Sequence, residues 1–591
     1  MINPSENNNG LPDRLDGIKV ARSCIDGMIS AAPAGMKVMI LDAATTQIVS
    51  AVYSQTEMLQ KKVYLVRTLQ QVQQAPNGTD HHPHAHAICF LRPTPSTFQL
   101  LATELRSPHY TSYSLYCAGP LDPSLLSPLA TADATHERLT KIHDYACPDA
   151  VPVAPHLWHA QCGRQSIALT VAAGTSWAPQ YAAAYERHVN SLSSLLATFG
   201  APVVMRYAAA SAAAEEVARD AMESIQHIVQ ENTRRQQPRC CVLVVDRRDD
   251  PVTPLLSQWT YQAMVHELLG LNNHRVVLKG APGINTPDLE EVVLSPASDP
   301  FFAEHQGKNF GELGEEIQRL LHDYQKQQSA HSAQHLQSIE EMQSFMEKFP
   351  EVRSQQHTVS KHVAIMGELS RIVETCNLLD VSALEQGLAC HDDHSAHWRE
   401  LMEKLNSNKV KLPDKLRLGL LYALRYEHVA NLHMLQQAMS KGGVPPDMVQ
   451  LVPSMLRYAG SKSRGPGLYK NQNADIMRRV TQNLVSTVQG IENVYTQHTP
   501  LLIDTLQSLI KGKLTTREYP VLMGNANAPT SSFDTILVCM VGGMTYEEGA
   551  HMAEWNSNSK ANGGVKVVLA GSTVHNSTSF LDELKQASAA V

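Results

Sequence analysis

Three strand-like segments, one in the middle of the chain and two near its end, constrain the fold more than any other feature. Near the end, TILVCMV (535–541) and VKVVLAGS (565–572) flank a helix-like segment in a βαβα pattern. Such a pattern needs a larger parallel sheet to join. The nearest other buried strand is CVLVVD (241–246), far earlier in the chain. We therefore predict a discontinuous α/β domain with a large helical domain inserted into it.

A separate α/β domain is predicted at the start of the chain. Strand-like segments recur there about every 25 residues, with helix-like sequence between them: KVMILD (37–42), KKVYLV (61–66), AHAICFL (85–91) and SYSLY (112–116). The alanine-rich stretch 156–235 is predicted to be helical, and 254–482 overwhelmingly so. The predicted domains are 1–149, then 150–250 together with 483–591, and the helical 251–482 with a helical hairpin at about 310–352.

Composition excludes several classes of protein. Hydrophobic residues make up 43% of the chain and charged residues 18%, so a large core is expected. The formal net charge of −8 argues against nucleic-acid binding. We find no signal-peptide pattern and no apolar run near the ~18 residues of a membrane span. The ten cysteines form no C-x-x-C pair, which predicts reduced thiols in a cytoplasmic protein.

The segment DRRDDPVTP (246–254) offers two interpretations. Three carboxylates after a buried strand, Asp246, Asp249 and Asp250, would suit a phosphate-handling enzyme. However, no phosphate-binding G-x-x-x-x-G-K-[ST] motif accompanies them. The structural interpretation explains more residues and is favoured, with Thr253 as the N-cap of a helix that starts at Pro254. The residues expected to be structural are Asp246, Arg247, Asp250, Pro251, Thr253 and Pro254.

Two other motifs also have structural and chemical interpretations. GGMTYEEG (542–549) could bind a phosphate on its backbone N–H groups, but Thr545 and Glu548 form a T-x-x-E capping box that accounts for it. HHPHAH (81–86) could hold zinc or copper, but a solvated loop is favoured. We therefore predict no catalytic residue, no metal and no cofactor.

The segment 246–270 resembles the signature of the SM (Sec/Munc-type) syntaxin-binding family. Further similar blocks follow in order, including VSKHVAIMGELSRIVE (359–374), NLLDVSALEQGLAC (377–390), GGMTYEEG and VHNSTSFLDEL (574–584). The resemblance implies an arch of three domains, with the second domain built from two chain segments. It also implies binding to an endosomal or trans-Golgi syntaxin (a Qa-SNARE) and to the assembled SNARE complex, in order to promote membrane fusion.

The resemblance carries over two surfaces, residue by residue. The central cleft between the first and third domains is expected to use Glu57, Lys61 and Lys62. The pocket for a syntaxin N-terminal peptide is expected to use Leu126, Leu129, Ile142 and Tyr145. Asp122, Pro123 and Ser127 depart from the family pattern there. Core packing is the alternative role for the four pocket residues. Separately from the resemblance, helical spacing in the predicted hairpin gives each of its two helices an apolar face, and we hypothesise that these faces align SNAREs. The residues concerned are Ile317, Leu321, Tyr324, Ile339 and Met342.

By analogy, a rabenosyn-like Rab effector is a further expected partner, and the protein is expected to sit peripherally on endosomal and Golgi membranes through its partners. Two rival functions stay open at this stage: the phosphate-handling enzyme, and a rigid tethering scaffold that never contacts SNAREs.

Overall fold

The computed structural model describes most of the chain, in eleven stretches. These are 15–74, 82–133, 137–171, 179–199, 202–232, 240–281, 284, 286–330, 339–469, 495–524 and 533–589. Among the described residues, no helix combines the length and the apolarity needed to cross a membrane.

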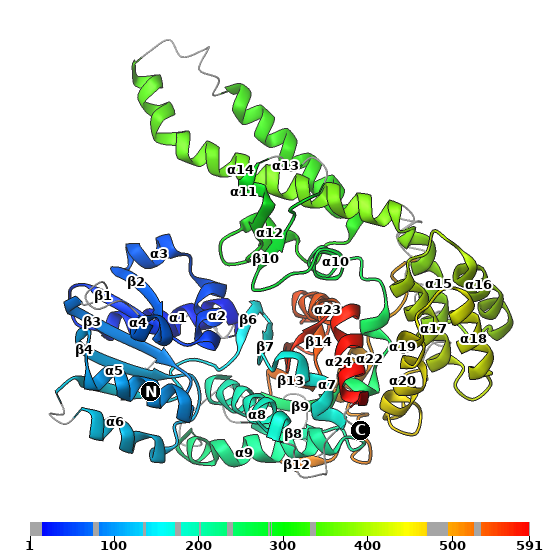
Figure 1. Ribbon diagram of the computed structural model, residues 1–591, viewed down its shortest axis with the longest axis horizontal. Helices are drawn as coiled ribbons and strands as arrows, with labels where there is room; N and C mark the ends of the chain where they lie inside the picture. Colours follow the sequence, from blue (N-terminus) through cyan, green and yellow to red (C-terminus); the bar gives the residue numbers. More distant parts are fainter. Residues whose placement is uncertain are drawn as a thin grey trace.

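The first α/β domain is a parallel five-stranded sheet covered by helices (Figure 1). The strand order is β2 (Val63–Thr68), β1 (Lys37–Leu41), β3 (His82–Leu91), β4 (Tyr110–Cys117) and β5 (Leu139–His143). The helices are α1 (Gly17–Ala31), α2 (Ala43–Val52), α3 (Gln55–Gln60), α4 (Leu69–Gln74), α5 (Pro95–Arg106) and α6 (Leu126–Ala132), with the 3-10 turn η2 (Pro123–Leu125). Asp42 and Ser54 start α2 and α3 through capping boxes.

The histidine tract corrects one prediction. Residues 82–86 were expected in a solvated loop, but they begin strand β3. His86 is buried, and its ring nitrogens lie 2.7 Å from Ser112 Oγ and 3.0 Å from Ser114 Oγ on β4. Burial lowers the pKa of His86.

The second sheet draws its strands from both ends of the inserted sequence, as predicted. Its order is β12 (Val521–Met523), β8 (Pro202–Tyr207), β9 (Cys240–Asp246), β13 (Thr535–Val541), β15 (Lys566–Gly571), β7 (Leu157–His159) and β6 (Val151–Ala154). The middle strand β13 pairs in parallel with β9 and β15. Only the edge pairs β12–β8 and β6–β7 are antiparallel. The two-residue strands β14 (Met544–Thr545) and β16 (Val574–His575) pair beside this sheet.

Helices from both segments cover the second sheet. They are α7 (Ser166–Val171), α8 (Pro179–Phe199), α9 (Ala212–Asn232), α22 (Leu501–Ile510), α23 (Tyr546–Ser557) and α24 (Ser577–Ala589), with the 3-10 turn η3 (Gly163–Gln165). The prediction that 156–235 is all helical was wrong, because β7 and β8 lie within it. Alanines in that stretch occupy the buried faces of α8 and α9, among them Ala184, Ala214 and Ala218.

The insertion is mainly helical, with a small antiparallel pair of strands that the sequence analysis missed. Its strands are β10 (Arg275–Val277) and β11 (Glu291–Val293). Its first helices are α10 (Tyr261–Leu268), α11 (Pro287–Glu290), α12 (Pro300–His305), α13 (Phe310–Ala330) and α14 (Ile339–Thr375). We call the rest the helical lobe: α15 (Leu378–Cys390), α16 (His394–Asn406), α17 (Leu412–Arg425), α18 (Leu432–Lys441), α19 (Pro446–Val449) and α20 (Leu451–Ala459).

The arrangement is an arch (Figure 1). The first sheet lies on one side and the second at the base, while α13 and α14 project together from the insertion and the helical lobe closes the opposite side. Ser295 Oγ, in the insertion, donates a hydrogen bond to the carbonyl oxygen of Ala51 on α2 (3.2 Å). The predicted fold class is confirmed; the exact domain limits stay a prediction.

Candidate functional site

The carboxylate-rich segment after β9 forms a joint at the entry to the insertion. Asp246 ends the strand and caps the 3-10 turn η4 (Arg247–Asp249) by accepting the N–H of Arg248 (2.8 Å). Its other oxygen accepts a hydrogen bond from Ser211 Oγ (2.5 Å) and pairs with the Arg248 guanidinium (3.0 Å). Both oxygens of this buried carboxylate are therefore occupied by groups of the protein.

Asp250 organises the turn that follows. One oxygen accepts the N–H groups of Val252 and Thr253 (3.2 and 3.0 Å), and the other accepts Thr253 Oγ1 (2.6 Å) and the N–H of Leu501 (3.0 Å). Burial opposes ionisation, but Arg247, His498 and the Thr253 hydrogen bonds outweigh it and lower the pKa of Asp250. The start of the insertion and the chain that returns from it thus meet on one carboxylate.

These contacts correct the predicted helix start. Thr253 and Pro254 were expected to begin a long helix, but they lie in the short 3-10 turn η5 (Thr253–Leu255), and α10 begins only at Tyr261. The Thr253 hydroxyl donates to Asp250 and does not cap the N-terminus of a helix. Pro251 lies in the turn between η4 and η5 and is buried.

Arg247 has a partner that the sequence analysis did not identify. Its Nη1 donates to both carboxylate oxygens of Glu548 (2.9 Å each), which lies 301 residues further along the chain. Asp250 lies 3.8 Å from Nη2. Burial opposes the charge, yet Glu548 and Asp250 raise the pKa of Arg247. With side chains only 1% and 0% exposed, this ion pair fixes η4 to the start of α23.

Glu548 also completes the capping box predicted at GGMTYEEG. It accepts the N–H and the hydroxyl of Thr545 (2.9 and 3.1 Å). The two preceding glycines have φ angles of 87° and 89°. A Cβ at Gly542 would lie 2.9 Å from Cβ of Arg247, and one at Gly543 would lie 2.3 Å from the His575 ring. Close packing therefore explains both glycines, and no phosphate-binding role is needed to account for them.

This joint has the composition of an active site but not its geometry. The oxygens of Asp246, Asp250 and Glu548 accept hydrogen bonds from backbone, hydroxyl and guanidinium groups, so these carboxylates already have partners within the protein. Across the described stretches of the chain, no three His, Cys, Asp or Glu side chains form a group that could hold a metal ion. The joint therefore holds chain segments together, whereas Asp249 has a different environment, which we treat below.

Two of the three residues predicted for the central cleft are tied to α1. Glu57 pairs with Arg22, and Lys61 Nζ lies 2.6 Å from Asp26 Oδ1. Lys62 is exposed in a turn with φ of 64°. These contacts fix α3 and the start of β2 against α1. Their role in partner binding stays a prediction.

Exposed apolar side chains next to these residues escaped the sequence analysis. Leu59 on α3 and Tyr64 on β2 are 50% and 51% exposed. An isolated leucine or tyrosine in a sequence carries no mark of its exposure, so no pattern could have identified them beforehand.

The four residues predicted for the peptide pocket do not share one cluster. Leu129 is buried, and Leu126 packs partly buried against the same core on the outer face of the first sheet. Tyr145 packs instead against the main core, and its hydroxyl donates to the carbonyl of Ser224 (3.4 Å). Ile142 on β5 is 40% exposed. Leu126 and Ile142 belong to the first domain's outer cluster and edge strand and keep part of their surface exposed, whereas Tyr145 is held against the main core. The role of all four residues stays a prediction.

In the hairpin, formed by α13 and α14, the structure describes three of the five predicted side chains. Ile317 is buried, Tyr324 is partly exposed and Leu321 is 38% exposed. Ile339 and Met342 lie on α14, but their side chains fall outside the described residues, as does the linker 331–338.

Comparison with known proteins gives a consistent result. The family model described as "Sec1 family" matches residues 37–583. A human protein named vacuolar protein sorting-associated protein 45 is 39% identical over 580 residues, covering 96% of each chain. A Dictyostelium discoideum protein of the same name is 36% identical and covers 93% of each. A structure titled "SM Protein Vps45 in Complex with Qa SNARE Tlg2" matches with a TM-score of 0.85 and 34% identity, covering 97% of this chain and 98% of that one.

Proposed function

The chain belongs to the Sec1 family, and on that premise we propose that it binds a Qa-SNARE syntaxin and promotes SNARE assembly in endosomal and trans-Golgi vesicle transport. One observation carries the proposal: the whole-length likeness, at 34% identity, to a protein solved in complex with a Qa-SNARE. Membrane association would then be peripheral and mediated by partners, with a rabenosyn-like Rab effector as a further partner.

We also propose that the protein acts without enzymatic chemistry or a cofactor. The proposal is supported by the joint, where the carboxylate oxygens of Asp246 and Asp250 accept hydrogen bonds from groups of the protein itself. Purified protein should therefore show no turnover of ATP, GTP or a generic phosphomonoester. Turnover that Asp246→Asn abolishes would instead favour the phosphate-handling enzyme.

Two contact surfaces for the syntaxin are part of the proposal. The central-cleft surface comprises Glu57, Lys61 and Lys62, and it is supported by the ion pairs that hold α3 in place. The peptide surface comprises Leu126 and Ile142 of the four predicted residues, because Leu129 is buried and Tyr145 packs against the main core. A tether without SNARE contacts would need neither surface.

The test is titration calorimetry of the full chain with the cytosolic region of endosomal and trans-Golgi syntaxins. We expect Lys62→Glu to weaken binding of that region, because it reverses an exposed charge on the central-cleft surface. We expect Leu126→Arg to weaken binding of the isolated N-terminal peptide, because a buried unpaired charge is costly. Leu412→Arg is the matched control, since Leu412 is 40% exposed at the start of α17. A folded protein that binds none of these syntaxins would contradict the proposal, and a collapsed melt of Leu126→Arg would assign Leu126 to the core.

A further inference from the structure

A small pocket lies where the insertion, the helical lobe and the second domain meet. Its volume is about 190 Å³. Its walls are the segment before α10, α10 itself, the end of α14, the starts of α15 and α17, and the start of α24. Figure 1 shows the end of α14 running into α15 there, with α10 beside it. This pocket is separate from the joint and from both syntaxin surfaces proposed above.

The size of the pocket suits one apolar side chain better than a whole small molecule. Sites for drug-sized ligands have volumes of roughly 300–1,000 Å³, whereas an apolar cavity of about 150 Å³ accepts a benzene ring. Leu379 and Leu412, each next in sequence to a lining residue, are 43% and 40% exposed, so apolar surface continues outside the pocket. The apolar lining itself consists of Trp259, Met264, Leu268, Ile372, Leu378 and Pro413.

Two polar groups of the lining differ from the rest. Arg417 pairs with Asp414 (2.6 Å) and lies 3.9 Å from Glu267, so these three charges already have partners. In contrast, the amide nitrogen of Gln258 has no hydrogen-bond partner among the described residues, although its side chain is buried. Lys411 is exposed and takes part in none of the ion pairs that the described part of the chain forms. A buried donor and an exposed cation are therefore available to a ligand.

The position of Lys411 adds a second source of positive charge. Lys411 is the N-cap residue of the 14-residue helix α17, and no side chain caps that helix. The start of a helix carries a partial positive charge. The carboxylate of Asp414 in the first turn is already paired with Arg417. The opening of the pocket thus favours a carboxylate next to the apolar group that fills it.

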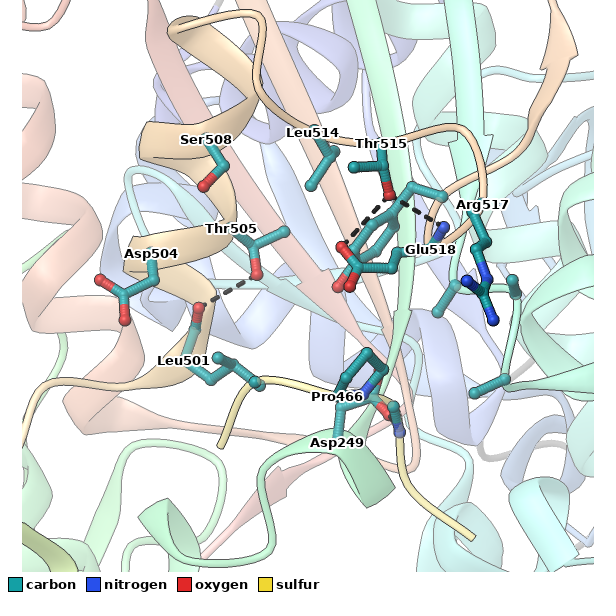
Figure 2. Close-up of a pocket in the computed structure, with 16 residues that line it drawn as sticks. Asp249, Pro466, Leu501, Asp504, Thr505, Ser508, Leu514, Thr515, Arg517 and Glu518 are labelled. Atoms are coloured by element: carbon teal, nitrogen blue, oxygen red, sulfur yellow. Dashed lines mark hydrogen bonds between the residues drawn. The ribbon is translucent and has the colours of Figure 1, made fainter. Parts of the chain in front are cut away.

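Polar side chains of a larger pocket, beside Asp249, already interact within the protein. Its volume is about 770 Å³. Figure 2 shows Thr515 and Glu518 bonded to each other on one wall (3.3 Å). Asp249 Oδ1 accepts the N–H of Gly465 (2.6 Å), and two neighbouring arginines favour its charged form, although burial and the charge of Asp246 raise the pKa of Asp249 to about 6. Size alone therefore does not identify a ligand site in this protein.

We propose that the smaller pocket, which we call the Gln258 pocket, binds one apolar anchor side chain of a partner protein whose neighbouring residue is acidic. Anchors that fill such pockets carry much of the affinity of protein interfaces. The acidic residue pairs with Lys411, and the Gln258 amide donates to a backbone carbonyl of the partner. The proposal does not rest on syntaxin binding, so its failure would leave the proposed function standing.

The test measures binding of the capped peptide acetyl-Ala-Phe-Glu-Ala-amide to the full chain by ligand-observed NMR. Two matched peptides remove one feature each: acetyl-Ala-Ala-Glu-Ala-amide lacks the ring, and acetyl-Ala-Phe-Gln-Ala-amide lacks the charge. We expect loss of the ring to weaken binding about tenfold or more, because ring burial dominates the contact. Loss of the charge should weaken it about two- to fivefold, because an exposed ion pair contributes little.

Variants of the protein test the same contacts from the other side. Thr578 lines the pocket at an exposed position of α24, so Thr578→Trp should fill the opening and abolish binding. Gln586→Trp, exposed on the same helix away from the pocket, is the matched control and should bind normally. Lys411→Gln should remove the preference for the glutamate peptide over the glutamine peptide, a change that partial unfolding would not produce. A thermal melt checks the fold of each variant.

Cys376 provides a readout inside the pocket. It lines the wall, and among the ten cysteines only Cys376 and Cys24 are partly exposed. The phenylalanine peptide should slow alkylation of Cys376 by iodoacetamide several-fold and leave the rate at Cys24 unchanged, as measured by mass spectrometry. Protection of neither thiol, or of both equally, would overturn the proposal. So would equal binding of the peptides with and without the ring, binding that Thr578→Trp leaves unchanged, or no binding at millimolar concentration.

Discussion

Substitution of Arg247 and Glu548 tests the joint most directly. Removing one partner of a buried ion pair leaves the other charge without compensation, at a typical cost of 3–5 kcal/mol. We therefore expect Arg247→Met to lower the free energy of unfolding by roughly that amount. The double variant Arg247→Met/Glu548→Gln should recover part of the loss, because it removes the stranded charge and keeps an oxygen for the Thr545 cap. Urea unfolding of the native protein, Arg247→Met, Glu548→Gln and the double variant measures the coupling, and additive losses in the double variant would refute the pairing.

Glu583 gives the protein a predicted pH dependence. It is 3% exposed on α24 and accepts the N–H of Ile167, yet burial raises its pKa to about 7 from the ordinary 4.5. A carboxyl group whose folded pKa is raised stabilises the fold at pH values below its unfolded pKa, and this contribution is lost as the pH rises through the folded pKa. Relative to Glu583→Gln, the native protein should lose up to about 3 kcal/mol between pH 4.5 and 8. A difference that stays constant across this range would contradict the assignment.

The hairpin is the element with the clearest functional prediction. Leu321 is 38% exposed on α13, so Leu321→Glu should leave stability within about 0.5 kcal/mol. If the hairpin aligns SNAREs, the variant should slow liposome fusion while syntaxin binding stays unchanged. Glu315→Gln, on an exposed position of the same helix, is the control. Fusion at the native rate with the folded Leu321→Glu protein would show that α13 does not align SNAREs through this residue.

Local sequence patterns predicted those elements whose apolar residues are also buried in the fold. The strands β1, β9 and β13 and the apolar part of β3 (85–91) are buried runs that the sequence analysis found. In contrast, β8 follows an alanine-rich helix, and β10 and β11 have only three residues each, so tertiary pairing decides them. Thr253 looked like a helix cap because a sequence does not show that its hydroxyl already serves Asp250. Likewise, the T-x-x-E motif predicted one role of Glu548, and its second partner, 301 residues away, left no local pattern.

At the scale of the whole molecule, α24 connects the second sheet to the helical lobe. Phe580, Leu581 and Leu584 pack in one cluster with Ile167 of α7 and with the buried leucines of α17 and α20. Asn576 and Ser577, at the start of the same helix, bond to His266 and Glu267 of α10 (2.9 Å each). The last helix of the chain therefore contacts elements on both sides of the insertion boundary.

This placement predicts that damage to α24 destabilises two domains together. Phe580 is fully buried, and Phe580→Ala should cost about 3–5 kcal/mol through the cavity it leaves. Hydrogen exchange should then rise both in α17 and α20 and in α7, because all of them lose the same neighbour. Lys585→Ala on the same helix is the control, since its pair with Asp447 is exposed at both ends and such pairs contribute little to stability. Faster exchange confined to α24 itself would show that the helical lobe and the second sheet keep their stability independently.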